Sequence, residues 1–129
     1  MAFLMGGVVG WEREAGGKPA GLRTLILVST GSALFVLVTQ WVAETMDAGP
    51  DMVRIIAGIA QGIGFLGAGT IVVTHGAVHG LTTAAAVWTI SAVGTACGFG
   101  AWQIALAGTL AMFVTLRVMS WVEARMAHK

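Results

Sequence analysis

The chain has 129 residues, a length that favours a single domain covering residues 1–129. Apolar residues make up 57% of it, and only 10% of the residues are charged, against about 25% in an average soluble domain. A water-soluble chain of this size could not bury so much apolar surface. The net charge of +1, without a basic run, and the single cysteine argue against a nucleic-acid-binding module and a disulfide scaffold.

Charged residues are absent from two long stretches of the chain. Residues 55–116 form an uncharged run of 62 positions, and residues 24–43 form another of 20. A membrane-spanning helix needs about 20 mostly apolar residues, so these runs predict three spans and one span. Residues 1–10 are apolar but would reach only about 15 Å as a helix. We expect them to be the end of a span whose start is missing, rather than a signal peptide.

Turn-forming residues set the boundaries of the spans. Glycine, proline and aspartate cluster in several of the intervening segments, 16–21, 47–50, 74–80 and 97–101. The predicted spans are 1–12 (partial), 22–44, 54–74, 81–97 and 101–120, which makes the fold an all-α polytopic transmembrane helix bundle of about five spans. Four of the five tryptophans lie near predicted span ends, as in an aromatic belt. The fifth, Trp88, is expected to pack between helices.

The positive charges are distributed unevenly between the two predicted sides. Segment 12–23, segment 74–80 and the C-terminal tail share one side and carry every lysine and arginine except Arg54. Because positive residues stay in the cytoplasm, the C-terminus is predicted to be cytoplasmic and the N-terminus to lie outside. Residues 117–129 either continue the last span as a short interfacial helix or form a frayed end.

An internal repeat is also suggested by the sequence. Residues 21–35 and 80–94 share seven of fifteen residues at an offset of 59. Each unit would contain two spans, so the units would be parallel and related by an axis along the membrane normal. Coincidence in an apolar sequence of low complexity is the alternative.

The third predicted span is unusually rich in glycine. Gly62, Gly64 and Gly67 match a dinucleotide-binding pattern, but no strand or acidic residue accompanies them, and we reject that function. We expect close packing between helices through small residues four positions apart, since lipid supplies no hydrophobic drive for helix association. Span 3 is therefore expected to be the central helix, with Gly94 and Gly98 acting likewise in span 4. The packing glycines of span 3 are Gly58, Gly62, Gly64, Gly67 and Gly69.

Polar residues at the predicted cytoplasmic side suggest two local arrangements. We expect Glu12 to pair with Arg23 across the first loop, the alternative being that both contact solvated lipid headgroups. Three threonines are candidate N-caps of spans 2 and 4: Thr24, Thr82 and Thr83. If the repeat is real, two helix N-termini would converge with Arg23 and resemble an anion site, with ordinary capping as the alternative.

The opposite side carries an acidic loop. Glu44, Asp47 and Asp51 offer oxygen atoms of the kind that magnesium prefers, although a solvated turn explains them more simply. Asp51 and Arg54 are three positions apart and are expected to pair at the start of span 3.

The remaining polar residues give weaker indications. His75 and His79 would suit a metal only in a helix, and the neighbouring glycines predict a turn instead. Gln61 is polar within span 3 and is expected to face the bundle rather than lipid. Cys97 is interpreted as a small packing residue. Since the sequence offers no nucleophile–base pair and no cluster of metal ligands, we expect no enzyme activity, no cofactor and no metal site.

Five motifs occur in order and together resemble the MgtC/SapB family of bacterial inner-membrane proteins. The resemblance covers about residues 3–100, and its motifs are Gly10-Trp11-Glu12-Arg13-Glu14, Ala20-Gly21-Leu22-Arg23-Thr24, Asp51-x-x-Arg54-Ile55, the glycine-rich segment 62–69, and Gly80-Leu81-Thr82-Thr83-Ala84-Ala85 with Trp88. The resemblance implies a small membrane domain with a role in adaptation to low magnesium and, in some members, in survival inside macrophages. It also implies restraint of the F-type ATP synthase or a link to phosphate homeostasis.

The resemblance assigns functional positions and also marks departures. The family-like polar residues are Glu12, Arg13, Arg23, Thr24, Asp51 and Arg54. We expect this chain to lack the cytoplasmic C-terminal domain of longer members. His79 stands where the resemblance leads us to expect a basic residue, and Gly58 stands where it leads us to expect a glutamine. The first hypothesis is a non-enzymatic regulator that acts by helix–helix contact with a membrane complex, as a homodimer in the lipid bilayer. The alternative is a small dimeric transporter or channel for an ion or phosphate.

Overall fold

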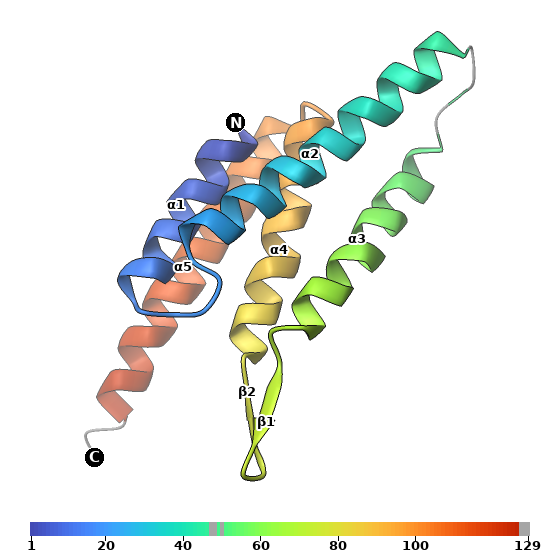
Figure 1. Ribbon diagram of the computed structural model, residues 1–129. Helices are drawn as coiled ribbons and strands as arrows, with labels where there is room; N and C mark the ends of the chain where they lie inside the picture. Colours follow the sequence, from blue (N-terminus) through green and yellow to red (C-terminus); the bar gives the residue numbers. More distant parts are fainter. Residues whose placement is uncertain (47–48, 50, 127–129) are drawn as a thin grey trace.

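The computed structural model describes residues 1–46, 49 and 51–126. Within this part of the chain it contains five helices and one two-stranded hairpin (Figure 1). The elements in chain order are α1 (Ala2–Ala15), α2 (Leu22–Thr45), α3 (Met52–Ala68), β1 (Val72–Thr74), β2 (Ala77–His79), α4 (Leu81–Gly98) and α5 (Trp102–Met126). The expected all-α membrane bundle is confirmed.

Three of the helices are long and apolar enough to cross a membrane. These are α2, with 24 residues, α4, with 18, and α5, with 25. At 1.5 Å per residue, α2 reaches about 36 Å and α4 about 27 Å, close to the thickness of the hydrocarbon core. Helix α3 is apolar but shorter, with 17 residues. Helix α5 continues to Met126, so residues 117–126 extend the last span as a continuous helix.

The third predicted span ends earlier than expected. The sequence predicts one helix over residues 54–74, but α3 ends at Ala68 and the chain then forms the antiparallel β1–β2 hairpin. His75 and Gly76 have φ angles of 50° and 81°, which suit a tight two-residue hairpin turn. The run from Ile71 to Thr74 is apolar and β-branched, and apolarity alone does not separate a short strand from a helix end.

Helix α4 occupies the centre of the bundle. It contacts α1, α2, α3 and α5 (Figure 1), and its buried residues Val87 and Ile90 belong to the core cluster with Val9, Leu25 and Ala105. Helix α3 lies at the edge instead, and Gly67 is the one buried residue of this helix. The expectation that the third span is central is therefore wrong.

Close helix contacts use different glycines from those expected. A Cβ atom on Gly6 would lie 2.6 Å from the Leu25 carbonyl oxygen, and one on Gly94 would overlap the Ser29 carbonyl, so α1 and α4 both approach α2 at glycines. Gly98 likewise faces Val36 and Ala33, which confirms packing at the Gly94/Gly98 pair.

The glycines of α3 make few such contacts. A Cβ atom added to Gly58, Gly62 or Gly64 would have no neighbouring atom within 4 Å, and one on Gly69 would meet only the end of its own helix. Gly67 alone packs against a neighbour, Ala84 of α4. The predicted packing role within this chain is thus limited to one of the five glycines.

The loops separate into two ends of the bundle. The α1–α2 loop, the hairpin and the C-terminal end of α5 lie at one end, whereas the N-terminus and the α4–α5 loop lie at the other (Figure 1). This arrangement agrees with the predicted alternation of spans. Two side chains differ from expectation: Trp88 is 53% exposed rather than packed between helices, and Gln61 is exposed on α3 rather than facing the bundle. Trp88 borders an open cavity between α3, α4 and the start of α5, whereas Gln61 lies on the face of α3 that borders neither described cavity.

The two helix pairs share one feature of the suggested repeat. Gly21 and Gly80 are the N-cap residues of α2 and α4. A glycine of α1 packs against Leu25 of α2, and a glycine of α3 packs against Ala84 of α4. Both pairs of equivalent positions, 21 with 80 and 25 with 84, are 59 residues apart. Nevertheless, α1 packs along α2, whereas α3 diverges from α4 away from the hairpin (Figure 1). The repeat stays a hypothesis.

Candidate functional site

A buried arginine lies where α1, the first loop and α4 meet. Arg13, in the last turn of α1, is only 3% exposed. Its Nη2 atom donates hydrogen bonds to the Pro19 carbonyl oxygen at 3.0 Å and to the Thr83 hydroxyl at 2.5 Å. Its Nε atom is buried and has no partner among the described residues. The Arg13 side chain thus connects the α1–α2 loop and the first turn of α4 to the end of α1 by hydrogen bonds.

No described carboxylate forms an ion pair with this buried guanidinium. The one ion pair between described residues joins Asp51 and Arg54. Arg13 instead lies at the C-terminal end of α1, where unpaired carbonyl groups and the helix dipole favour a positive charge. The Pro19 carbonyl adds a second partial negative charge. The hydrogen-bond acceptors of this guanidinium among the described residues are therefore neutral oxygen atoms.

The expected ion pair between Glu12 and Arg23 is wrong. Glu14, not Glu12, reaches the start of α2, and its Oε2 atom accepts a hydrogen bond from the Leu22 backbone N–H at 2.8 Å. Arg23 is exposed and forms no ion pair with any described residue. A free backbone N–H at a positive helix end binds a carboxylate better than a solvated guanidinium does.

The threonine N-caps are also wrong. Gly21 and Gly80 are the N-cap residues of α2 and α4, and neither helix has a side-chain cap of its own. Thr24 is exposed, and Thr83 is buried as the acceptor for Arg13. Because the Glu14 carboxylate already binds the start of α2, the protein supplies its own anion there. The anion site suggested from two free helix ends is therefore not formed at α2.

The expected pair at the start of α3 is confirmed. The Asp51 carboxylate accepts hydrogen bonds from the Arg54 backbone N–H at 3.0 Å and from its Nε at 3.3 Å. Both side chains are largely exposed, 57% and 87%, so the ion pair contributes little while the N-cap bond stabilises the helix. These two residues lie at the opposite end of the bundle from the four other family-like polar residues, Glu12, Arg13, Arg23 and Thr24.

Metal binding finds no support in the described part of the chain. No group of three or more histidine, cysteine, aspartate or glutamate side chains is close enough to hold an ion. His75 and His79 lie in the hairpin, not on a helix, as the turn interpretation predicted. Glu44 is exposed at the end of α2, and Asp47 lies outside the described residues.

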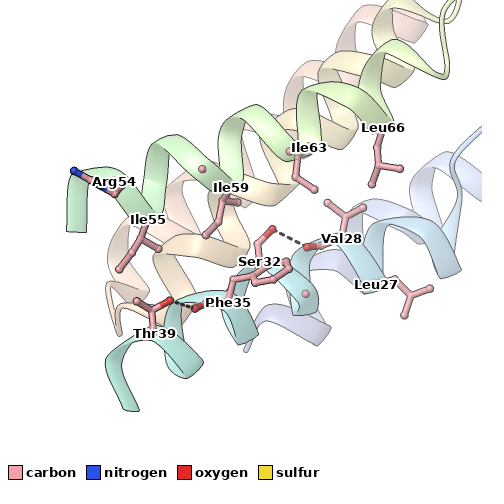
Figure 2. Close-up of a pocket in the computed structure, with 13 residues that line it drawn as sticks. Leu27, Val28, Ser32, Phe35, Thr39, Arg54, Ile55, Ile59, Ile63 and Leu66 are labelled. Carbon is pink, nitrogen blue, oxygen red and sulfur yellow. Dashed lines mark hydrogen bonds between the residues drawn. The ribbon is translucent and has the colours of Figure 1, made fainter. Parts of the chain in front are cut away.

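A groove of 620 Å³ runs between α2 and α3. Figure 2 shows its walls, with Arg54 at one end and Leu66 toward the other. The Ser32 and Thr39 hydroxyls in its wall donate to carbonyl oxygens of their own helix, at 2.9 Å and 2.8 Å. The groove is otherwise mainly apolar, and it is lined by Leu27, Val28, Gly31, Ser32, Phe35, Thr39, Arg54, Ile55, Gly58, Ile59, Gly62, Ile63 and Leu66.

A smaller cavity of 340 Å³ lies on the other side of α3, against α4 and the start of α5. Trp88 and Phe99 supply aromatic surface there, and Ile59 borders both cavities. Helix α3 therefore contacts the bundle through Gly67 at the hairpin end and through Ile63, and an apolar cavity borders it on each of two sides.

Comparison with known proteins identifies the family. A model described as the MgtC family matches residues 1–125. The chain belongs to the MgtC family. MgtC of Salmonella typhimurium strain LT2 is 44% identical over 110 residues, covering 84% of this chain and 45% of that protein. SrpB of Synechococcus elongatus is 43% identical over 126 residues, covering 90% of this chain and 69% of SrpB.

A third relative carries a functional name. YhiD of Escherichia coli K12, named as a candidate magnesium transporter, is 37% identical over 133 aligned residues, which cover all of this chain and 62% of YhiD. This MgtC family chain thus spans between about half and two thirds of the length of the relatives described. No solved structure shows a significant match. The apolar helices and the MgtC family relatives together make this a membrane protein.

Sequence reasoning named most of the polar residues and the Asp51–Arg54 pair, but not the partners of Arg13 and Glu14. The family motif assigns Arg13, but it does not predict the contact with Thr83, because the two residues are 70 positions apart. The position of Arg13 at the end of a helix, next to a loop containing Gly and Pro, was the available signal. The groove could not be predicted from the sequence. Its lining residues come from two helices, α2 and α3, and both helices are apolar on the faces that line the groove and on those that do not.

Proposed function

We propose that this MgtC family member is a non-enzymatic protein of the bacterial inner membrane that acts in adaptation to low magnesium. In this proposal it docks onto another membrane complex, with the F-type ATP synthase as the candidate partner, and contributes to survival inside host cells where the bacterium is a pathogen. Its similarity to MgtC and to the candidate magnesium transporter YhiD supports the link to magnesium.

The outer face of α3 is the observation that carries this proposal. Ala57, Gln61, Gly64 and Ala68 are exposed, follow each other at helical spacing and line neither of the two cavities. A polar amide in an apolar span is unfavourable against lipid and favours a hydrogen-bonding partner. Small residues beside it allow the backbone of a second helix to approach closely. This outer face has the composition of a helix-docking surface.

The proposal is tested by ATP hydrolysis in inverted membrane vesicles from cells grown at low magnesium. We expect the wild-type protein to lower the hydrolysis rate of the F-type ATP synthase and Gly64→Leu to restore at least half of the lost activity. No atom lies within 4 Å of a Cβ at Gly64, so this variant retains room to fold. Ala111→Leu, an exposed small-to-large change on α5, is the matched control and should inhibit like the wild type. Equal inhibition by both variants, or none by the wild type, rejects the proposal.

Self-association through the same face is part of the proposal. A cysteine at Gly64 in a Cys97→Ser background should form a disulfide-linked dimer in membranes if two copies meet there. If the crosslink does not form and the protein is monomeric in detergent, the homodimer is contradicted. The outer face of α3 would then serve only for contact with the partner complex.

A small dimeric transporter or channel for an ion or phosphate is the second candidate. The name of YhiD favours it. The groove between α2 and α3 gives it little support, because Arg54 is the one charged residue among the described residues that line it. Flux of magnesium or phosphate into liposomes containing the protein, abolished by Arg23→Ala, would replace the regulator with the transporter.

A further inference from the structure

We propose that the groove between α2 and α3 binds one phospholipid with a phosphoethanolamine headgroup. The acyl chains follow the groove, Arg54 binds the phosphate, and Asp51 beside it binds the ammonium group. This site is separate from the outer face of α3 and does not depend on the function proposed above.

The walls of the groove select an apolar occupant. The hydroxyls of Ser32 and Thr39 donate to Val28 and Phe35 carbonyl oxygens within α2, so they offer no free donor to the groove. Water in such a space would lack the two to four polar partners that it needs. Three glycines widen the groove, and no atom lies within 4 Å of a Cβ at any of them: Gly31, Gly58 and Gly62.

The length of the groove suits an acyl chain. On α3 the lining extends from Arg54 to Leu66, which is about 18 Å of helix at 1.5 Å per residue. This is slightly more than half of the hydrocarbon core, which is about 30 Å thick. An acyl chain that enters beside Arg54 can therefore follow the groove through one leaflet.

The charges at the end of the groove select the headgroup. The Arg54 side chain is 87% exposed, and its two terminal nitrogens bond no described residue, since Asp51 takes only Nε and the backbone N–H. A guanidinium fork of this kind matches a phosphate. The Asp51 carboxylate lies beside it, 3.3 Å from the Arg54 Nε atom. A carboxylate beside the arginine complements a phosphate joined to a primary ammonium, which donates three hydrogen bonds, and a purely anionic lipid has no group for that carboxylate.

The binding test uses the full chain purified in detergent and three phospholipids with the same dioleoyl chains. Native mass spectrometry measures retained phosphatidylethanolamine, phosphatidylglycerol or phosphatidylcholine at equal concentration. We expect at least fivefold more retained phosphatidylethanolamine than either other lipid. Arg54→Gln should abolish this preference, whereas Arg117→Gln, an exposed arginine outside the groove, should leave it unchanged. Equal retention of the three lipids overturns the proposed headgroup site.

A second pair of variants tests the groove itself. Gly62→Leu fills the groove, whereas Gly64→Leu adds the same side chain two positions away outside it, and both positions have free space. Gly62→Leu should reduce retained lipid at least fivefold and Gly64→Leu should not. The opposite pattern, or equal retention, overturns the lipid site. Loss of a dimer with Gly62→Leu and unchanged lipid would show that a second copy occupies the groove. Gly64 belongs to the outer face of α3, whereas Gly62 lines the groove. The effect of Gly62→Leu on retained lipid therefore tests the lipid site whether or not the regulator proposal holds.

Discussion

The guanidinium of Arg13 donates a hydrogen bond to the Thr83 hydroxyl and thereby joins the end of α1 to the first turn of α4, 70 residues further along the chain. The same nitrogen binds the Pro19 carbonyl, so the loop before α2 is held in the same place. One buried side chain thus connects the first helix pair to the second. A hydrogen bond of a charged group contributes about 1.5–3 kcal/mol.

Thr83→Val should therefore lower the free energy of unfolding in detergent by about 1.5–3 kcal/mol, because valine keeps the shape but removes the acceptor for Arg13. Unfolding by denaturant, followed by circular dichroism, measures the change. Thr82→Val is the control, since Thr82 is exposed and should change stability by less than about 0.5 kcal/mol. Equal effects of the two substitutions would show that the hydrogen bond to Arg13 does not stabilise the fold.

Gly94→Ala should separate α4 from α2. The new methyl group would overlap the Ser29 carbonyl, and backbone cannot move aside as a flexible side chain can. We expect a loss of about 1–3 kcal/mol or more in stability, from the cost of overpacking. Gly31→Ala, in a position with no neighbour within 4 Å, should be neutral or stabilising because alanine favours helix. A stable Gly94→Ala protein would contradict the close contact between the two helices.

Glu14→Ala should weaken the start of α2, because the Leu22 N–H loses its acceptor. The expected cost is about 0.5–2 kcal/mol, the range for removing a helix cap. Hydrogen exchange at the first turn of α2 gives a local measurement of this opening. Glu12→Ala should leave the exchange there unchanged, and faster exchange in that variant would restore Glu12 as the residue that acts on α2.

The positive charges predict that the α1–α2 loop faces the cytoplasm. In a Cys97→Ser background, Lys18→Cys should react with a membrane-impermeant maleimide only after the inner membrane is opened. Met46 is 73% exposed at the other end of the bundle. Met46→Cys should react in cells whose outer membrane is permeable while the inner membrane is still intact. Labelling of Lys18→Cys before the inner membrane is opened would reverse the predicted orientation.

Helix positions were predictable because insertion into lipid depends on composition along the chain. The predicted spans 22–44 and 81–97 differ by one residue at one end from α2 and α4. The Asp51–Arg54 pair was predictable as well, since both partners lie within one helical turn. The β1–β2 hairpin was not, because its apolar strand residues carry the same hydropathy as a helix end.

Composition and charge along the chain identified a membrane helix bundle, the positions of most of its helices and the polar residues at the helix ends. Three features became apparent only in the folded chain: α4 is central, Gly6 and Gly94 make close contacts while Gly58, Gly62 and Gly64 do not, and Arg13 binds Thr83. The reason is physical. In lipid the outward and inward faces of a helix are both apolar, so no amphipathic stripe marks the face that packs.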